Sequence, residues 1–251
     1  MTPPAWPYPY WIAHRGAGKL APENTLAAFR LGADHGWRMF ECDAKLSADG
    51  VPFLLHDSTL PRTTSGADLV AGDLPWSALA RLDAGSWHSR SYAGEPVPTL
   101  ENVARFCLRN GYLLNIEIKP TPGHERATGE AVAVLAAELW KDQPVPPLLT
   151  SFKPAALEGA RATAAHLPRG LLLENLRGGW LDQARSLGCV AVVNKHTEWT
   201  AAAVHQTQLS GLKALAYTVN EAEAAARLGG FGVDGIITDR IDLFAPAAPP
   251  A

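Results

Sequence analysis

The chain has 251 residues, of which 47% are hydrophobic and 19% are charged, and its formal net charge at pH 7 is −3. These values are typical of a globular protein with a sizeable core. They argue against a protein that binds nucleic acid through its charge, because the sequence contains no block of Lys and Arg that would attract a phosphate backbone. A small-molecule partner is therefore favoured.

The cysteines and the N-terminal stretch bear on the compartment. Cys42, Cys107 and Cys189 lie far apart without a CxxC motif, so the sequence indicates neither a disulfide framework nor a thiolate metal site. The N-terminal stretch lacks the basic and apolar regions of a signal peptide, and no apolar run reaches the roughly 18 residues that a bilayer requires. We therefore expect a cytoplasmic protein without membrane insertion. Its oligomeric state stays open, with a homodimer as one option.

Short apolar runs rich in β-branched residues alternate along the chain with segments of helical spacing. The sequence predicts eight strands: Trp11–His14, Met39–Leu46, Leu113–Lys119, Leu148–Phe152, Gly170–Glu174, Cys189–Asn194, Ala214–Val219 and Gly235–Thr238. It predicts six helices: Thr25–His35, Ala127–Trp140, Pro154–Ala165, Trp180–Leu187, Thr200–Leu209 and Glu221–Leu228. Eight alternating units predict an α/β fold, a (β/α)8 TIM barrel, with an open doubly wound sheet as the alternative.

The segment from about residue 57 to residue 109 interrupts this alternation. It is rich in Pro, Gly, Ser and Trp, includes LDAGSWHSRSYAGEPVPTL, and takes the place of a simple helical crossover. Long loops in compact domains are commonly functional, and this one contains apolar anchors. We interpret it as a small insertion subdomain after the second strand that caps one mouth of the barrel, within a single domain of residues 1–251.

The active site of such a barrel forms at the carboxyl ends of its strands. Polar side chains gather at the ends of the early strands: His14, Arg15, Glu41, Asp43, His56, Glu117 and Lys119. Alternate residues of a strand share a face, so Glu41 and Asp43 should point the same way, as should Glu117 and Lys119. Cys42 and Ile118 should point to the opposite face.

This set of side chains favours phosphate ester chemistry. Burying three carboxylates near one point is costly unless a cation compensates, and oxygen donors favour Mg²⁺ or Ca²⁺ over zinc. The alternative is that the charges pair with one another. Two histidines can take up and release a proton near neutral pH, although a single histidine is commonly structural. Arg15 and Lys119 suit the oxygens of an anionic phosphoryl group.

The motifs HRGAGKLAPENTLAAF, ECDAKLSADGVPFLLHD, NIEIKP, YTVN and GVDGIITD closely resemble those of glycerophosphodiester phosphodiesterases, most of all the bacterial cytoplasmic type. The resemblance covers residues from about 6 to 242. It implies a TIM barrel with an inserted subdomain, a divalent-metal requirement, and hydrolysis of substrates such as glycerophosphocholine and glycerophosphoethanolamine to sn-glycerol 3-phosphate and an alcohol. It also implies three sets of roles: metal ligands Glu41, Asp43 and Glu117; acid and base His14 and His56; phosphate contacts Arg15 and Lys119.

Other residues are weaker candidates for substrate contacts. Phe152, Tyr217 and Asn220 end later strands and could line the substrate pocket, although an aromatic on a barrel strand commonly belongs to the core. Trp87 and His88 in the insertion either close over the alcohol or, for Trp87, anchor the subdomain.

The turn PENT after the first strand has two interpretations. Glu23 and Asn24 either brace the loop that precedes the first helix or simply cap that helix.

The sequence leaves the details of the reaction open. We expect His56 to be the acid that protonates the leaving alkoxide, and the nucleophile is either water or the neighbouring glycerol hydroxyl, through a cyclic phosphate. Two other functions remain as alternatives: a lysophospholipase D-like phosphodiesterase, and a barrel that binds phosphodiesters without hydrolysing them.

Overall fold

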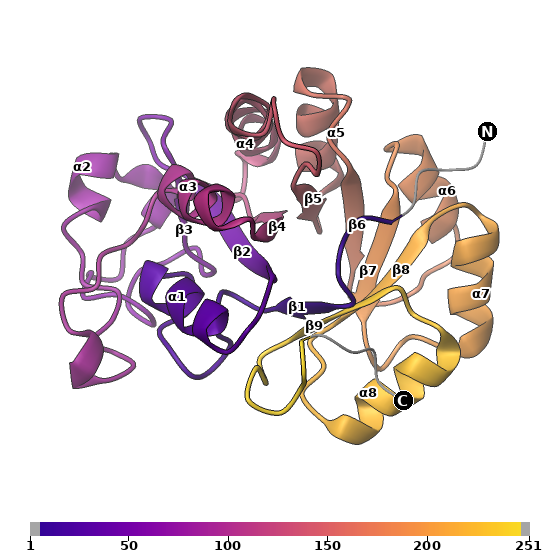
Figure 1. Cartoon of the computed structure of the whole chain (residues 1–251). Helices are drawn as coiled ribbons and strands as arrows, with labels where there is room; N and C mark the ends of the chain where they lie inside the picture. The colour runs from indigo at the N-terminus through magenta and orange to yellow at the C-terminus, as the bar shows by residue number, and fades with distance from the viewer. Residues whose placement is uncertain (1–5, 247–251) are drawn as a thin grey trace.

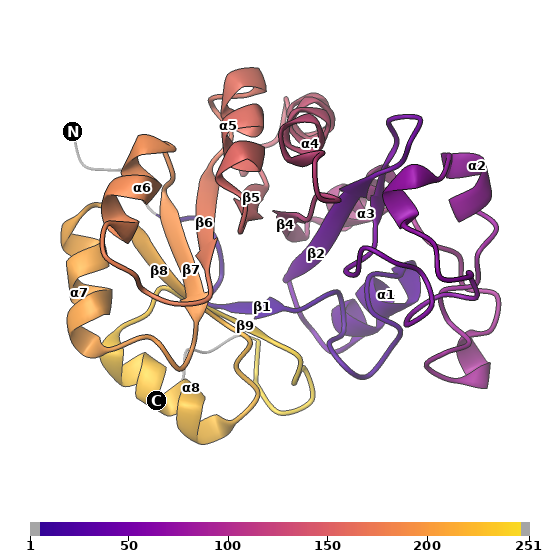
Figure 2. The same ribbon diagram turned by 180° about the vertical axis from the view of Figure 1, so that it is seen from behind.

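Eight parallel strands close into a barrel in the computed structural model, which describes residues 6–246 (Figures 1 and 2). The strands are β1 Trp11–Ala13, β2 Met39–Leu46, β4 Leu113–Ile118, β5 Leu148–Ser151, β6 Arg169–Leu173, β7 Ala191–Lys195, β8 Lys213–Tyr217 and β9 Gly235–Thr238. The barrel closes because β1 pairs in parallel with both β2 and β9. The predicted TIM barrel is therefore confirmed, and the open sheet is wrong. Each predicted strand is present, with bounds shifted by at most two residues.

Helices follow the strands and surround the barrel (Figure 1). They are α1 Leu26–Asp34, α3 Leu100–Asn110, α4 Glu125–Leu139, α5 Pro154–Thr163, α6 Trp180–Ser186, α7 Ala201–Leu209 and α8 Ala222–Phe231. The Thr25 side chain caps α1 by accepting a hydrogen bond from the Ala28 amide. Over residues 6–246, no helix is long and apolar enough to cross a membrane.

Helix α3 corrects one expectation about the second unit. The segment from about residue 57 to residue 109 was expected to replace the crossover helix, but its end forms Leu100–Asn110. Thr99 and Asn102 form a capping box at the start of α3, and Gly111 in the left-handed conformation ends it. The helix was missed because it directly follows the Pro-rich stretch of the insertion, although both caps are readable in the sequence.

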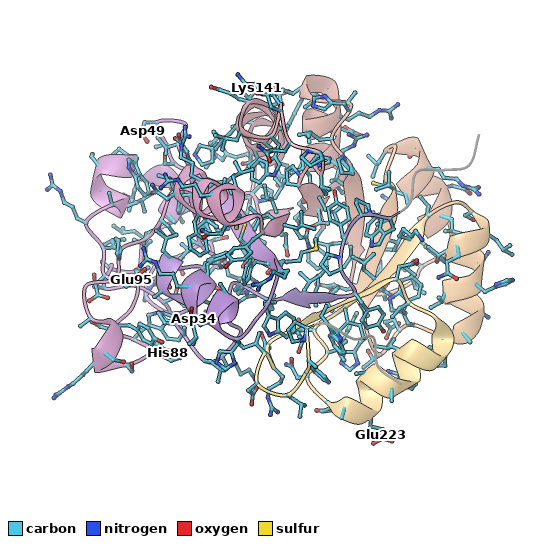
Figure 3. All side chains as sticks on the ribbon, viewed as in Figure 1. Asp34, Asp49, His88, Glu95, Lys141 and Glu223 are labelled. Carbon is cyan, nitrogen blue, oxygen red and sulfur yellow. The ribbon has the colours of Figure 1, made fainter. Side chains whose placement is uncertain are left out.

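The rest of the insertion forms a small subdomain beside β2 (Figure 1). The subdomain combines the short strand β3 Pro52–Leu54, which precedes the insertion and is antiparallel to β2, with the short helix α2 Trp76–Leu79 of the insertion. It has a hydrophobic cluster of its own, formed by Phe53, Leu55, Leu60, Ala71, Leu79, Ala84 and Val97. Glu95 fastens it to α1 by accepting a hydrogen bond from the Ala27 amide at 2.9 Å; Figure 3 shows Glu95 beside this helix.

Alternate residues of each strand divide the core into two layers. Ile12, Met39, Leu148, Val193 and Leu215 pack inside the barrel. The residues between them, including Cys42 and Ile118, belong to the larger cluster between strands and helices, as predicted. This alternation places the polar residues at positions 41, 43, 117 and 119 in the interior, toward the carboxyl ends of β2 and β4.

Helices α4 and α5 approach each other closely through two glycines. A Cβ atom on Gly129 would lie 2.0 Å from the carbonyl oxygen of Ala156, and one on Gly159 would lie 2.4 Å from that of Arg126. These positions have no room for a side chain, so the contact depends on backbone packing against backbone.

We expect Gly129→Ala to lower the free energy of unfolding by about 1–3 kcal/mol, because the added methyl group forces the two helices apart. Urea denaturation measures the change. Gly230→Ala in α8 is the matched control, since a Cβ there meets no atom within 4 Å, and it should be neutral or stabilising by up to about 1 kcal/mol. Equal effects of the two substitutions would contradict the proposed contact.

Candidate functional site

A cavity of about 460 Å³ opens at the carboxyl ends of the strands. Most of the residues singled out in the sequence line it: His14, Arg15, Glu41, His56, Glu117, Lys119, Phe152 and Tyr217. Asp43 has no exposed surface and is not among the residues that line the cavity, although it lies close to Glu41 and Glu117. The structure therefore brings together side chains that are more than two hundred residues apart in the sequence.

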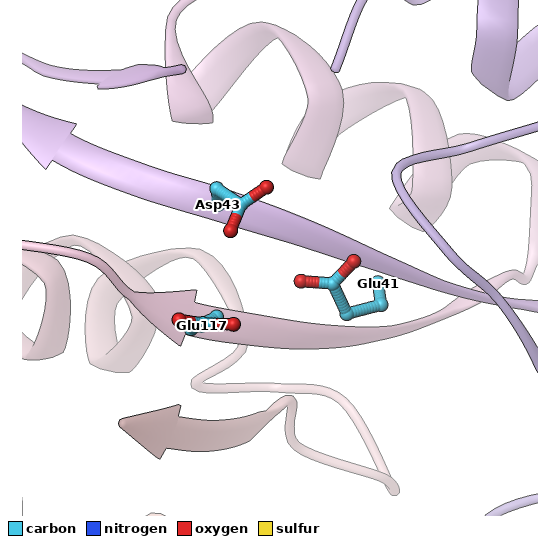
Figure 4. Close-up of side chains that lie close together, drawn as sticks. All are labelled: Glu41, Asp43 and Glu117. Atoms are coloured by element: carbon cyan, nitrogen blue, oxygen red, sulfur yellow. The ribbon is translucent and has the colours of Figure 1, made fainter. Parts of the chain in front are cut away.

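Three carboxylates meet at the floor of this cavity. Glu41 and Asp43 extend from β2 toward Glu117 on β4, where Asp43 and Glu117 are register partners (Figure 4). One oxygen from each of the three side chains lies within 4.8 Å of the others, and all three residues are buried. The sequence determines this placement through the Glu-x-Asp spacing on β2 and the parallel pairing with β4.

The donor set fits a divalent cation. Within residues 6–246, Glu41 Oε1 and Asp43 Oδ1 have no hydrogen-bond partner. Burial, reinforced by Asp43, raises the pKa of Glu41 well above its usual value and that of Glu117 to about 7. Carboxylates that resist ionisation because they lie together are stabilised as anions by a hard cation, and oxygen donors suit Mg²⁺ or Ca²⁺.

Asp43 differs from its two neighbours because cations surround it. Burial would raise its pKa, but Arg15 and Lys119 outweigh burial and hold the pKa below the usual range. Arg15 Nε lies 3.1 Å from Asp43 Oδ2, and Lys119 Nζ lies 3.6 Å from Asp43 Oδ1. Lys119 Nζ also lies 2.8 Å from Glu117 Oε1. Arg15 and Lys119 therefore neutralise part of the negative charge of the carboxylates. Such pairing within the protein is the alternative to metal binding that the sequence leaves open.

The loop after β1 adopts a constrained backbone that orients these acids. Arg15 and Asn24 have φ values of 52° and 60°, in the left-handed region that side chains rarely adopt. The Arg15 amide donates to Glu41 Oε2 at 3.0 Å. The Asn24 side chain donates to Asp43 Oδ2 at 2.8 Å and accepts from the Asp43 amide at 3.0 Å. Asn24 therefore braces the site, whereas Thr25 caps the helix.

Each of the two histidines is held by an aspartate. His14 Nδ1 lies 2.6 Å from Asp239 Oδ1, and His56 Nδ1 lies 2.7 Å from Asp57 Oδ1. The pKa of Asp57 is about 2, chiefly because Arg62 donates hydrogen bonds to it. That of Asp239 is also about 2, because the contact with His14 outweighs burial. The ionised carboxylates assign the proton of each pair to Nδ1, which leaves Nε2 as the acid or base atom.

An ion-pair network links the second histidine to the first loop. Arg62 donates to Asp57 Oδ2 at 2.6 Å and to both carboxylate oxygens of Glu23. Glu23 also accepts a hydrogen bond from Arg15 at 2.8 Å. Since Arg15 contacts Asp43, the two loops and the acidic cluster form one electrostatic unit. Glu23 thus braces the loop, as one interpretation of PENT expected.

The weaker candidates occupy different places. Phe152 and Tyr217 line the cavity, and their rings meet edge to face at 5.7 Å. In the described chain, Asn220 is absent from the lining, and its side chain contacts Asp239 at 2.8 Å. Trp87 and His88 also lie outside the lining; Trp87 donates to the Ala84 carbonyl and His88 contacts the Lys19 carbonyl.

Comparison with known proteins identifies the family. Residues 14–243 match the model of the glycerophosphoryl diester phosphodiesterase family. The chain belongs to this family. A glycerophosphodiester phosphodiesterase from Caldanaerobacter subterraneus is 34% identical over 233 residues, which are 91% of this chain and 93% of that protein.

Solved structures of related proteins agree with the fold. A phosphodiesterase from Oleispira antarctica, in complex with the product sn-glycerol-3-phosphate, has a TM-score of 0.85 and 34% identity over 92% of this chain and 93% of that one. A glycerophosphodiester phosphodiesterase from Agrobacterium tumefaciens has a TM-score of 0.78 and 27% identity over 94% and 99% of the two chains.

Four residues of the site were not predicted from the sequence, and the first of them, Asp57, directly follows His56. Asp239 follows β9, and the rule that polar residues at strand ends form the site could have found it. Arg62 lies in the insertion, where no sequence signal links it to Glu23. Lys45 is buried in the cavity, donates to the Lys119 carbonyl at 3.0 Å, and has a pKa lowered by burial to about 8; its place on the Glu41 face of β2 was readable.

Proposed function

We propose that this chain hydrolyses glycerophosphodiesters, such as glycerophosphocholine and glycerophosphoethanolamine, to sn-glycerol 3-phosphate and an alcohol. The observation that carries the proposal is the pair of aspartate-held histidines, which share one cavity with the buried carboxylates and two cations. Family membership supports it, as does the product bound to the Oleispira antarctica relative. The predicted cytoplasmic location remains part of this proposal.

Glu41, Asp43 and Glu117 are the residues that would hold one divalent cation, Mg²⁺ or Ca²⁺. A cation bound there supplies positive charge that offsets the negative charge that builds up on the phosphoryl oxygens. Arg15 and Lys119 add fixed positive charge on the same side of the cavity. Arg15 is suited to phosphate because its guanidinium is planar and its position is set by Glu23 and Asp43.

The two histidines share the proton transfers. Burial lowers the pKa of His56, so the ring can be neutral near neutral pH and needs a proton before it acts as an acid. We assign His56 the protonation of the leaving alkoxide and His14 the activation of the nucleophile. Asp57 and Asp239 fix the ring orientations through Nδ1, and Asn220 positions Asp239. The nucleophile is water or the neighbouring glycerol hydroxyl.

Purified protein should release choline and sn-glycerol 3-phosphate from glycerophosphocholine in the presence of Mg²⁺ or Ca²⁺, and EDTA should abolish the release. Both products are quantified by coupled enzymatic assays. A lysophosphatidylcholine arm tests the lysophospholipase D-like alternative. Folded protein that binds glycerophosphocholine without releasing product would instead support the non-catalytic barrel.

His14→Ala and His56→Ala should each lower kcat by roughly 10²–10⁴, because each removes a group that transfers a proton in the transition state. Steady-state kinetics measure the loss, and circular dichroism checks folding. His205→Ala is the matched control, since this histidine is exposed on α7, and its kcat should stay at the unsubstituted value. Near-normal turnover of either cavity variant would remove that histidine from the mechanism.

Glu117→Gln should weaken divalent-cation binding at least about tenfold, because it removes a charged ligand. Substitution of residues that merely hydrogen-bond to a metal ligand commonly lowers metal affinity by roughly 10- to 100-fold. Isothermal titration calorimetry with Mg²⁺ and with Ca²⁺ measures affinity independently of activity. Glu130→Gln, on α4 with a half-buried side chain paired with Arg126 outside the cavity, serves as the control. Unchanged affinity of the Glu117 variant would show that the cation binds elsewhere.

A further inference from the structure

A second cavity adjoins the first on the side of β6 and α6. Its volume is about 560 Å³, and it shares Phe152, Lys153, Leu172 and Glu174 with the catalytic cavity. Beyond this shared wall it is lined by the loop between β6 and α6 and by the first turns of α6. Because four residues line both cavities, a molecule held at the histidines lies next to the second cavity.

The lining of the second cavity offers hydrogen-bonding groups that the protein does not use. Lys153, Glu174 and Gln183 make no side-chain hydrogen bond or ion pair to any of residues 6–246. Arg177 Nε donates to Asn175 Oδ1 at 2.9 Å, and the terminal nitrogens of its guanidinium have no partner in the same range. This wall combines donors and acceptors, as a ligand with several hydroxyl groups requires.

The charges and the aromatic rings disfavour a cationic ligand. Two cations, Lys153 and Arg177, face one carboxylate, Glu174. A quaternary ammonium group has no hydrogen to donate and is bound by aromatic cages. Here Phe152 already has Lys119 Nζ at 5.5 Å from its ring centroid, and the other aromatic residue of the lining, Trp180, meets Trp199 edge to face at 6.1 Å, so the lining offers no aromatic cage. An indole beside amide, guanidinium and carboxylate groups suits a neutral polyol better.

We propose that the second cavity binds the leaving alcohol of the diester and selects neutral polyhydroxylated alcohols, such as glycerol, inositol or a hexose, over choline. The inference rests on the proposed function. Arg15 and Lys119 hold the phosphate in the first cavity, and the glycerol arm lies there with it. The second arm of the diester then leaves past Phe152 and Glu174, where Arg177, Gln183 and Trp180 meet its hydroxyl groups.

The test compares kcat/KM of the cation-loaded protein for glycerophosphoglycerol, glycerophosphoinositol, glycerophosphocholine and the methyl ester of sn-glycerol 3-phosphate. The polyol substrates should exceed the choline ester by roughly tenfold, as expected when a ligand gains one or two hydrogen bonds. Arg177 and Gln183 are both at exposed positions. Arg177→Ala and Gln183→Ala should each lower the ratio of kcat/KM for the polyol esters to kcat/KM for the methyl ester by roughly fivefold or more, mainly by raising KM for the polyol esters.

Arg185→Ala is the matched control, because Arg185 lies on α6 like Gln183 but outside the lining of the second cavity. This variant should leave the ratio of kcat/KM for the polyol esters to kcat/KM for the methyl ester unchanged. If the choline ester is hydrolysed as well as the polyol esters, the inference about the second cavity is wrong but the proposed function stands. The same holds if the Arg177 and Gln183 variants retain the parent ratio. Hydrolysis of none of the four diesters by folded protein would contradict the proposed function as well.

Discussion

The burial of three carboxylates at one point is the constraint on which this site depends. Glu41, Asp43 and Glu117 lie on adjacent strands inside the barrel, where water cannot stabilise three negative charges. The surrounding chain compensates with Arg15, Lys119 and the Asn24 amide. Each compensating group comes from the end of a strand or the loop that follows it, which is where this architecture allows variation without loss of the fold.

The same constraint explains the backbone of the first loop. Arg15 and Asn24 adopt left-handed conformations that cost energy, and both thereby reach the carboxylates of β2. The ion pairs of Glu23 and Arg62 then extend this unit into the insertion, where Arg62 holds Asp57. The insertion is therefore part of the framework of the site, because its Arg62 holds the carboxylate that contacts His56.

The two halves of the barrel contribute different parts of the site. The first half, from β1 to β4, supplies the carboxylates, the cations Arg15 and Lys119, and both histidines. The later strands supply Asp239, which holds His14, and the walls that face a substrate, including Phe152 and Tyr217. The second cavity also belongs to this later half. Under the proposed function, this division separates the residues that act on the phosphate from those that meet the leaving alcohol.

The sequence by itself determined the barrel and the acidic cluster, because strand periodicity and Glu-x-Asp spacing are local patterns that fix which side chains share a face. It did not reveal α3, whose caps follow a Pro-rich stretch. It also missed the pairing of His14 with Asp239, more than two hundred residues away, and the contact of Arg62 with Glu23. Only tertiary structure decided these, because closure of the barrel by β1 and β9 and the docking of the insertion bring distant charges together.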